Sequence, residues 1–234
     1  MEHKYAHSVT EVAEILQKKY RNFIHHNKRN PLDELLFIIC SIKRSEKVYL
    51  ASFKALKRAF PSHKALLEAP THEISSILAS AGLQNQKALM IRQTLVAITE
   101  QFGRPTLNPL KKMSDAECEQ FLLGLHGIGR KVAHCVMMYS LGRQVFPVDS
   151  NCWRISCRLG WMKSSPKSNG YCSDKEMTLL EAKIPSHLRF SLHVNMVSHG
   201  REICKVQNPY CHECVIGYYC LYYRRADRGK LIAS

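Results

Sequence analysis

The chain has 234 residues, of which 45% are hydrophobic, enough for one compact unit or two packed lobes with a substantial core. This composition excludes a disordered tail, and no apolar run reaches the ~18 residues that a membrane-spanning helix needs. Lysine and arginine outnumber aspartate and glutamate by 34 to 19, a formal charge of +15. We therefore expect a polyanionic partner, nucleic acid first, with a basic solvated surface as the alternative.

The beginning of the chain, from Met1 to Lys4, leads into a polar amphipathic stretch without the apolar segment of a secretory signal. We therefore expect an intracellular protein outside the membrane, cytoplasmic and associated with the nucleoid if the source is prokaryotic. In that compartment the ten cysteines should be reduced, so a local group of them would bind a metal centre. Six are scattered and are interpreted as small buried hydrophobes: Cys40, Cys118, Cys135, Cys152, Cys157 and Cys172.

In chain order, the pattern predicts helices. Ser8 is spaced from Glu11 as in a capping box, which predicts a first helix beginning at Ser8. Asn30 followed by proline predicts the N-cap of a second, buried helix. Proline and glycine then divide the chain into helices of ordinary length, and Ser114 with Glu117 forms another capping box. Alternating strand patterns are missing, so the sequence predicts an all-α protein.

The segment from Leu122 to Ala133 reads LLGLHGIGRKVA and lies between two predicted helices. Gly127 and Gly129 would let the backbone approach a ligand closely, and the second helix would direct its N–H groups at a phosphate. Ile128 would anchor this turn in the core. A tight connection between helices without any ligand is the alternative interpretation.

Two ionisable residues lie within and after this segment of the sequence. Lys131 lies at the start of the second hairpin helix beside Arg130, and Asp149 opens the stretch DSNCWRI eighteen residues later. Taken singly, the lysine would be a solvated helix residue and the aspartate an N-cap. Together they are an amine and a carboxylate of the kind that nucleophilic catalysis requires.

Near the end of the chain, four cysteines follow the spacing Cys-x6-Cys-x2-Cys-x5-Cys. Four thiolates in so short a span can enclose one metal centre. Structural zinc sites usually pair two Cys-x-x-Cys segments, and only one is present here, but spacing alone does not choose between zinc and an iron-sulfur cluster. The residues are Cys204, Cys211, Cys214 and Cys220.

These features together resemble the helix-hairpin-helix DNA glycosylases of the endonuclease III superfamily. The hairpin string, the stretch around Asp149, the cysteine spacing and the turn at residues 82–88 all carry the resemblance, which covers nearly the whole chain. It implies a six-helix barrel at residues 30–146, with the helix-hairpin-helix at 122–133. Residues 1–29 and 147–234 would form a second helical lobe bearing a 4Fe-4S cluster on the four cysteines.

The resemblance also implies chemistry. Lys131 would attack C1′ of the deoxyribose and displace the base, leaving a Schiff base that allows β-elimination at the abasic site. Its place near a helix N-terminus and beside Arg130 would favour the neutral amine. Asp149 would steady the developing sugar cation. We therefore expect a monomeric, bifunctional glycosylase and lyase, acting on duplex DNA with a damaged or modified base, first of all a pyrimidine, or an abasic site.

DNA contacts are implied for the hairpin and for two loops. Relatives often carry a gap-filling glutamine where this chain has residues 41–45 without one, so Ile42 or Lys43 would be the wedge. Asn151 stands where endonuclease III proper usually has histidine, which is closer to the adenine-mismatch and plant demethylating branches. The implied contacts are Gly127, Ile128, Gly129, Arg130, Ile42, Lys43 and Lys205.

Three alternatives stay open at this point. The protein could be a monofunctional mismatch or modified-base glycosylase, or a DNA-binding relative that has lost its chemistry. A zinc-stabilised scaffold for protein partners would account for the cysteines, but it leaves the glycine hairpin and its lysine without a purpose.

Overall fold

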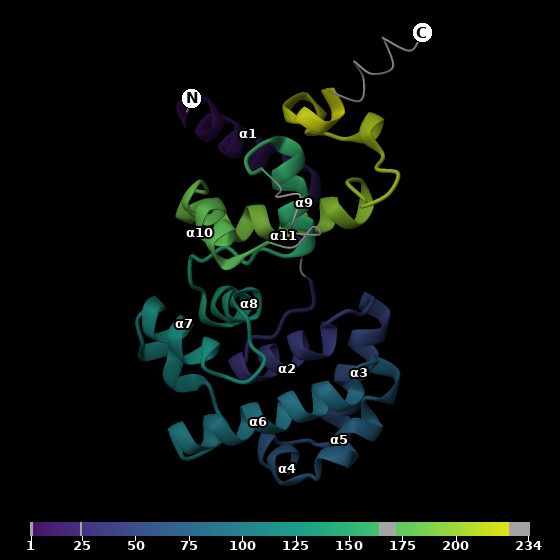
Figure 1. The fold of residues 1–234 in the computed structure, drawn as a ribbon, viewed down its shortest axis with the longest axis vertical. Helices are drawn as coiled ribbons and strands as arrows, with labels where there is room; N and C mark the ends of the chain where they lie inside the picture. Colours follow the sequence, from purple (N-terminus) through teal and green to yellow (C-terminus); the bar gives the residue numbers. More distant parts are fainter. Residues whose placement is uncertain (1, 24, 164–171, 225–234) are drawn as a thin grey trace. The chain divides into compact units, whose positions relative to one another are not determined.

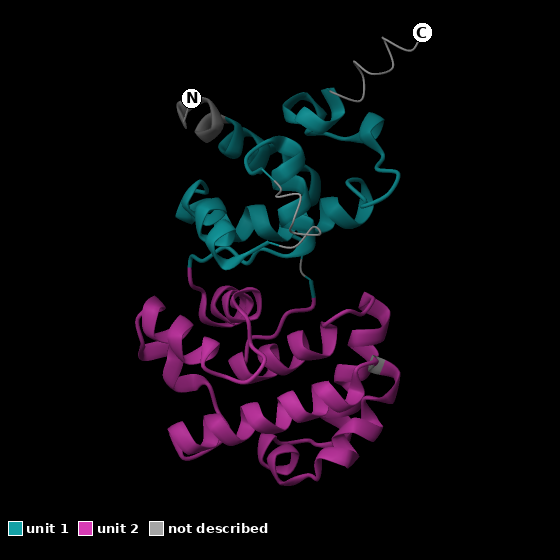
Figure 2. Cartoon of the chain, in the orientation of Figure 1, with its two compact units in different colours: residues 1–25, 144–234 teal, residues 26–143 magenta. Residues whose placement is uncertain are grey.

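The structure is a computed structural model that describes residues 2–23, 25–163 and 172–224 (Figure 1). All regular elements in these ranges are helical, and none is a strand, which confirms the all-α prediction. The chain divides into two compact units, shown in different colours in Figure 2. Unit 1 consists of residues 1–25 and 144–234, and unit 2 of residues 26–143. Within the described ranges, no helix combines the length and apolarity needed to cross a membrane.

Unit 2 contains helices α2 to α8, joined by short connections. Their bounds are α2 Pro31–Ser41, α3 Glu46–Ala59, α4 His63–Glu68, α5 Thr71–Ile77, α6 Gln84–Phe102, α7 Asp115–Leu123 and α8 Arg130–Leu141, with the 3-10 turns η1 Ala79–Ala81 and η2 Asn108–Lys112.

Helix α2 is central to unit 2, because it packs against α3, α6 and α8. Its start is as predicted: the Asn30 side chain accepts hydrogen bonds from two backbone N–H groups of the first turn, and Pro31 occupies the first helical position. Leu35, Leu36 and Ile39 are fully buried, so the helix is apolar on more than one side. The predicted capping box at the start of α7 is also confirmed, since Ser114 and Glu117 bond reciprocally.

Unit 1 is built around helix α11, which packs against α1 and α9. The bounds are α1 Glu2–Tyr20, α9 Ser150–Leu159, α10 Asp174–Ala182 and α11 Arg189–Glu202, with the 3-10 turns η4 Ser186–Leu188, η5 Cys211–Glu213 and η6 Gly217–Tyr219.

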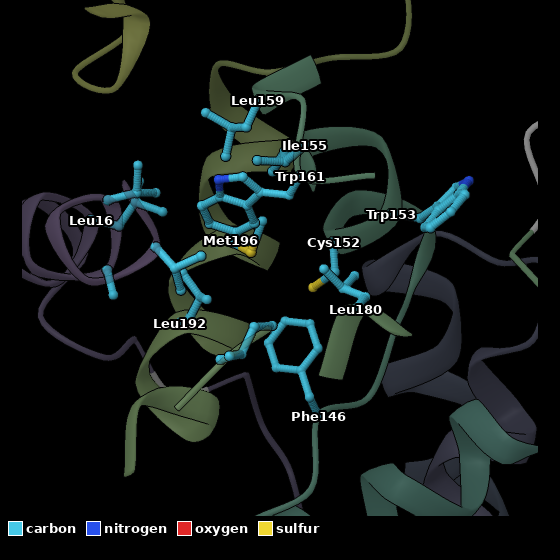
Figure 3. Packing of buried hydrophobic residues seen from close by; sticks show 14 of the residues in the cluster. Leu16, Phe146, Cys152, Trp153, Ile155, Leu159, Trp161, Leu180, Leu192 and Met196 are labelled. Carbon is cyan, nitrogen blue, oxygen red and sulfur yellow. The ribbon is translucent and has the colours of Figure 1, made fainter. Parts of the chain in front are cut away.

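The core of unit 1 gathers apolar side chains from all three packed helices. Figure 3 shows Leu16 of α1, Ile155 of α9 and Met196 of α11 beside the indole of Trp161. The predicted helix start at Ser8 is wrong, because α1 already begins at Glu2. Ser8 instead accepts a 2.9 Å hydrogen bond from Trp161 Nε1, so its hydroxyl satisfies the polar edge of a buried ring.

Candidate active site and cysteine centre

The hairpin between α7 and α8 is a tight turn whose glycines differ in purpose. Gly127 has φ +73°, which disfavours any other residue, and a Cβ there would lie 2.5 Å from Met90 Cε, so the methionine side chain would have to move. Gly129 is the N-cap of α8, and a Cβ there would meet nothing within 4 Å. Ile128 between them is 5% exposed and anchors the turn. The backbone at Gly129 is therefore open to a ligand such as a phosphate.

Lys131 is the second residue of α8 and is half-buried. Its helix starts without a side-chain cap, and the positive end of the helix dipole lies at this point. The charge of Lys131 acts on the buried carboxyl of Glu34 in α2, where it opposes the rise in pKa that burial causes.

Arg130 is engaged by a neighbour that the sequence analysis did not anticipate. Its Nε lies 2.9 Å from Glu119 Oε1 on α7, and His134 Nε2 lies 3.0 Å from the same oxygen. Glu119 thus fastens α7 to α8 across the hairpin and offsets part of the charge on Arg130.

The two wedge candidates lie in the turn after α2. Ile42 is half-buried and caps α2, whereas Lys43 is exposed with a left-handed φ of +52°. Leu83, in the turn before α6, is an apolar residue that is 41% exposed and has φ +53°. The sequence analysis treated residues 82–88 only as a turn and missed Leu83, although an exposed apolar side chain at a turn is typical of residues inserted between DNA bases.

Asp149 is the N-cap of α9 in unit 1. Its Oδ1 accepts from the Cys152 backbone N–H at 2.8 Å, and its Oδ2 accepts from Asn151 Nδ2 at 3.0 Å. A carboxylate is stabilised there by the helix dipole. The capping interpretation is therefore correct, and it leaves the carboxylate half-buried and oriented by two donors.

A chain of hydrogen bonds links Asp149 to the first cysteine of the C-terminal group. Arg154 donates through Nη2 to Asn151 Oδ1 and through Nε to the Cys204 carbonyl, both at 2.8 Å. Gly200 makes room for this arrangement, because a Cβ there would lie 2.6 Å from Asn151 Oδ1. Sequence reasoning missed Arg154, whose spacing of three residues from Asn151 on one helix was the available signal.

Four cysteines line one pocket of unit 1. They are Cys204, Cys211, Cys214 and Cys220, and the empty volume, including space open to solvent, is about 270 Å³.

Basic and polar groups surround these sulfurs. Arg158 Nη1 donates to Cys204 Sγ at 3.1 Å, and His199 Nε2 lies 3.5 Å from Cys214 Sγ. Burial raises the pKa of the Cys214 thiol to about 11. No three His, Cys, Asp or Glu side chains in the described part of the chain converge on a single metal ion.

The structure also shows the surroundings of Lys205 and of the six scattered cysteines. Lys205 Nζ donates to the Tyr210 hydroxyl at 3.3 Å and lies 4.3 Å from the centre of that ring. Of the six scattered cysteines, Cys157 and Cys172 are partly exposed, and the other four are buried as predicted: Cys40, Cys118, Cys135 and Cys152.

Comparison with known proteins identifies the family. Residues 38–174, which include the hairpin, Lys131 and Asp149, match the HhH-GPD superfamily of base excision DNA repair proteins. The chain belongs to this superfamily. It is 30% identical to endonuclease III of Sulfolobus acidocaldarius, over 91% of this chain and 92% of that one. It is 26% identical to endonuclease III of Thermotoga maritima, over 95% of this chain and 97% of that one.

The fold agrees with this assignment. A structure of a non-covalent endonuclease III–DNA complex matches with a TM-score of 0.79 at 22% identity, covering 95% of this chain and 98% of that one. Within the superfamily, the protein is a DNA glycosylase of base excision repair.

Proposed function

We propose that the protein is a bifunctional glycosylase and lyase that removes a damaged or modified base, in the first place a pyrimidine, and then cleaves the abasic site. The observation that carries this is Lys131 itself, a half-buried amine at the uncapped start of α8, directly after the open backbone of Gly129. Duplex DNA is the partner, bound by a monomer. Residues 30–146 would act as the barrel domain, and residues 1–29 with 147–234 as the cluster domain.

The chemistry divides between the two ionisable residues. Lys131 Nζ forms a bond to C1′ while the glycosidic bond breaks, and the base leaves with the electron pair and takes up a proton. The C1′–O4′ bond then opens as Nζ loses a proton and O4′ gains one, which gives the Schiff base. Loss of a proton from C2′ of this Schiff base shifts its electron pair into a C2′–C3′ double bond and expels the 3′ phosphate. Asp149, held as an N-cap, supplies the negative charge that stabilises the cationic sugar.

A panel of duplexes, each with one defined lesion, tests the glycosylase step. Release of an oxidised pyrimidine is the expected outcome, with modified cytosine and mismatched thymine or uracil as the other candidates. A protein that releases none of these bases, yet binds the duplexes, would be a DNA-binding relative without the chemistry.

We further propose that the four-cysteine pocket holds a 4Fe-4S cluster. The support is that all four cysteines line one pocket, and four cysteine thiolates are the ligand set that a 4Fe-4S cluster takes. The cluster would be architectural, fixing the loop after Cys204 through which Lys205 can reach phosphates. Arg158 adds a positive charge beside the Cys204 sulfur.

Cys211→Ser should lose most of the about four iron atoms expected per chain, together with the absorbance at about 400 nm. Soluble yield should fall as well, because cluster binding and folding of this loop are coupled. Cys172→Ser is the matched control, since Cys172 is a partly exposed thiol outside the pocket. Stoichiometric zinc without iron in protein prepared anaerobically would contradict the assignment.

Gly127→Ala should weaken binding to every duplex alike, by about tenfold or more, because the hairpin contacts backbone and reads no base. Gly103→Ala is the matched control: its φ is +72°, nothing lies within 4 Å of its Cβ position, and it lies at the end of α6. It should carry the same backbone strain without the loss of binding. Wild-type affinity should also fall steeply with salt, and a flat salt response would argue against a phosphate interface.

A further inference from the structure

The motif at residues 82–88 contains a long charged side chain that is almost fully buried, Lys87. Lys87 is 2% exposed, and its Nζ donates to the Cys40 carbonyl at 2.8 Å. Cys40 is the last residue but one of α2, so this bond satisfies one of the carbonyls that a helix end leaves open. Burying an amine costs free energy unless the amine is hydrogen-bonded. Here the buried amine bonds to the end of α2, directly before the turn that carries the wedge candidates Ile42 and Lys43.

Arg44 and Gly82 make a second connection to the same turn. A Cβ on Gly82 would lie 1.2 Å from Arg44 Nη2 and 2.2 Å from Arg44 Cζ, so the guanidinium occupies the space that only glycine leaves. Gly82 also has φ +53°, which disfavours any other residue. The Arg44 side chain, from the turn after α2, therefore packs against Gly82 in the turn before α6.

The turn at residues 41–45 is itself compact. Arg44 N–H donates to the Ser41 carbonyl at 3.2 Å, and Ser41 Oγ donates to the Ile38 carbonyl at 2.7 Å. Lys43, at its tip, is exposed in a left-handed conformation that a lysine adopts only when its surroundings impose it. The turn thus follows a helix end to which Lys87 bonds, and the side chain of its Arg44 packs over Gly82.

We propose that Lys87 is a positioning residue that, with Gly82, presents the turn at residues 41–45 in the conformation that fills the DNA stack beside an extruded base. This inference rests on the proposed function, which requires extrusion. An enzyme that extrudes a base must occupy the vacated space, and a turn already ordered avoids the entropy loss of ordering on DNA. Lys87 and Gly82 therefore act on the reaction through the wedge turn, without contacting the base.

Lys87→Met tests this, since it keeps the apolar length and removes the donor to Cys40. The duplex carries a tetrahydrofuran abasic analogue opposite 2-aminopurine, whose fluorescence reports the filling of the stack. We expect the fluorescence change to be lost and single-turnover nicking of a natural abasic duplex to slow by about tenfold to 100-fold. Affinity for undamaged duplex should stay within about twofold, because the hairpin contacts are untouched.

Lys57→Met is the matched control. It removes a 2.9 Å ion pair with Asp33 in the same unit and should leave fluorescence and nicking within about twofold of wild type. If Lys87→Met does not fold, Gly82→Ala replaces it, compared with Gly103→Ala for backbone strain. Either variant with wild-type fluorescence and nicking would overturn the positioning role. A wild-type protein that gives no fluorescence change would overturn stack filling by this turn, whereas failure to release any base from the lesion duplexes would overturn the proposed function.

Discussion

Lys131→Gln should bind abasic duplex DNA but neither nick it nor form an adduct that borohydride traps. Glutamine keeps most of the side-chain length and a polar end, but its amide nitrogen is not nucleophilic. The hairpin should survive the change, because Ile128 and the ion pair between Arg130 and Glu119 hold it independently of Lys131. The measurement is gel analysis of borohydride-treated mixtures, together with strand cleavage and a binding titration.

Lys112→Gln is the matched control for lost charge, since Lys112 lies in the last turn of η2 and outside the hairpin. It should trap and nick like wild type. If Lys131→Gln still nicks and still forms the adduct, another amine is the nucleophile. If the wild-type protein releases a base but never forms the adduct, the enzyme is monofunctional, with Asp149 activating water and Lys131 contacting phosphate.

Sequence patterns predicted the local features of this fold well where one residue decides the outcome. Asn30 and Ser114 cap their helices as expected, because a cap depends on a side chain and the few N–H groups that follow it. The prediction for Ser8 was wrong because its hydroxyl does not cap a helix. It accepts a hydrogen bond from Trp161, which is 153 residues away in the chain. No local pattern encodes such a contact.

The same distinction explains which site residues the sequence could not supply. Lys131 and Asp149 follow from motif positions, but the partners that orient their surroundings come from distant segments. Arg154 reaches the Cys204 carbonyl across 50 residues of chain, and Lys87 reaches the Cys40 carbonyl across 47. A charged side chain on a helix is usually expected to face solvent. Both of these side chains instead donate hydrogen bonds to backbone carbonyls, which come within reach only when the distant segments pack together.

Asp149→Asn should slow base release by roughly 100-fold or more, the scale of losing a preorganised electrostatic or acid-base group. The fold should be retained, because asparagine caps helices about as well as aspartate and its Oδ1 can still accept from the Cys152 N–H. Single-turnover release from a lesion duplex gives the rate, and thermal unfolding gives the stability.

Asp149→Ala separates the two roles of this side chain. Alanine removes the charge and the cap together, so it should slow base release at least as much as asparagine and also cost about 1 kcal/mol of stability. It also leaves Asn151 Nδ2 without its acceptor on Asp149, which should loosen the connection through Arg154 to Cys204. If Asp149→Asn works at the wild-type rate while Asp149→Ala is merely less stable, then Asp149 is a helix cap and no more, and the charge that steadies the sugar cation must come from another carboxylate.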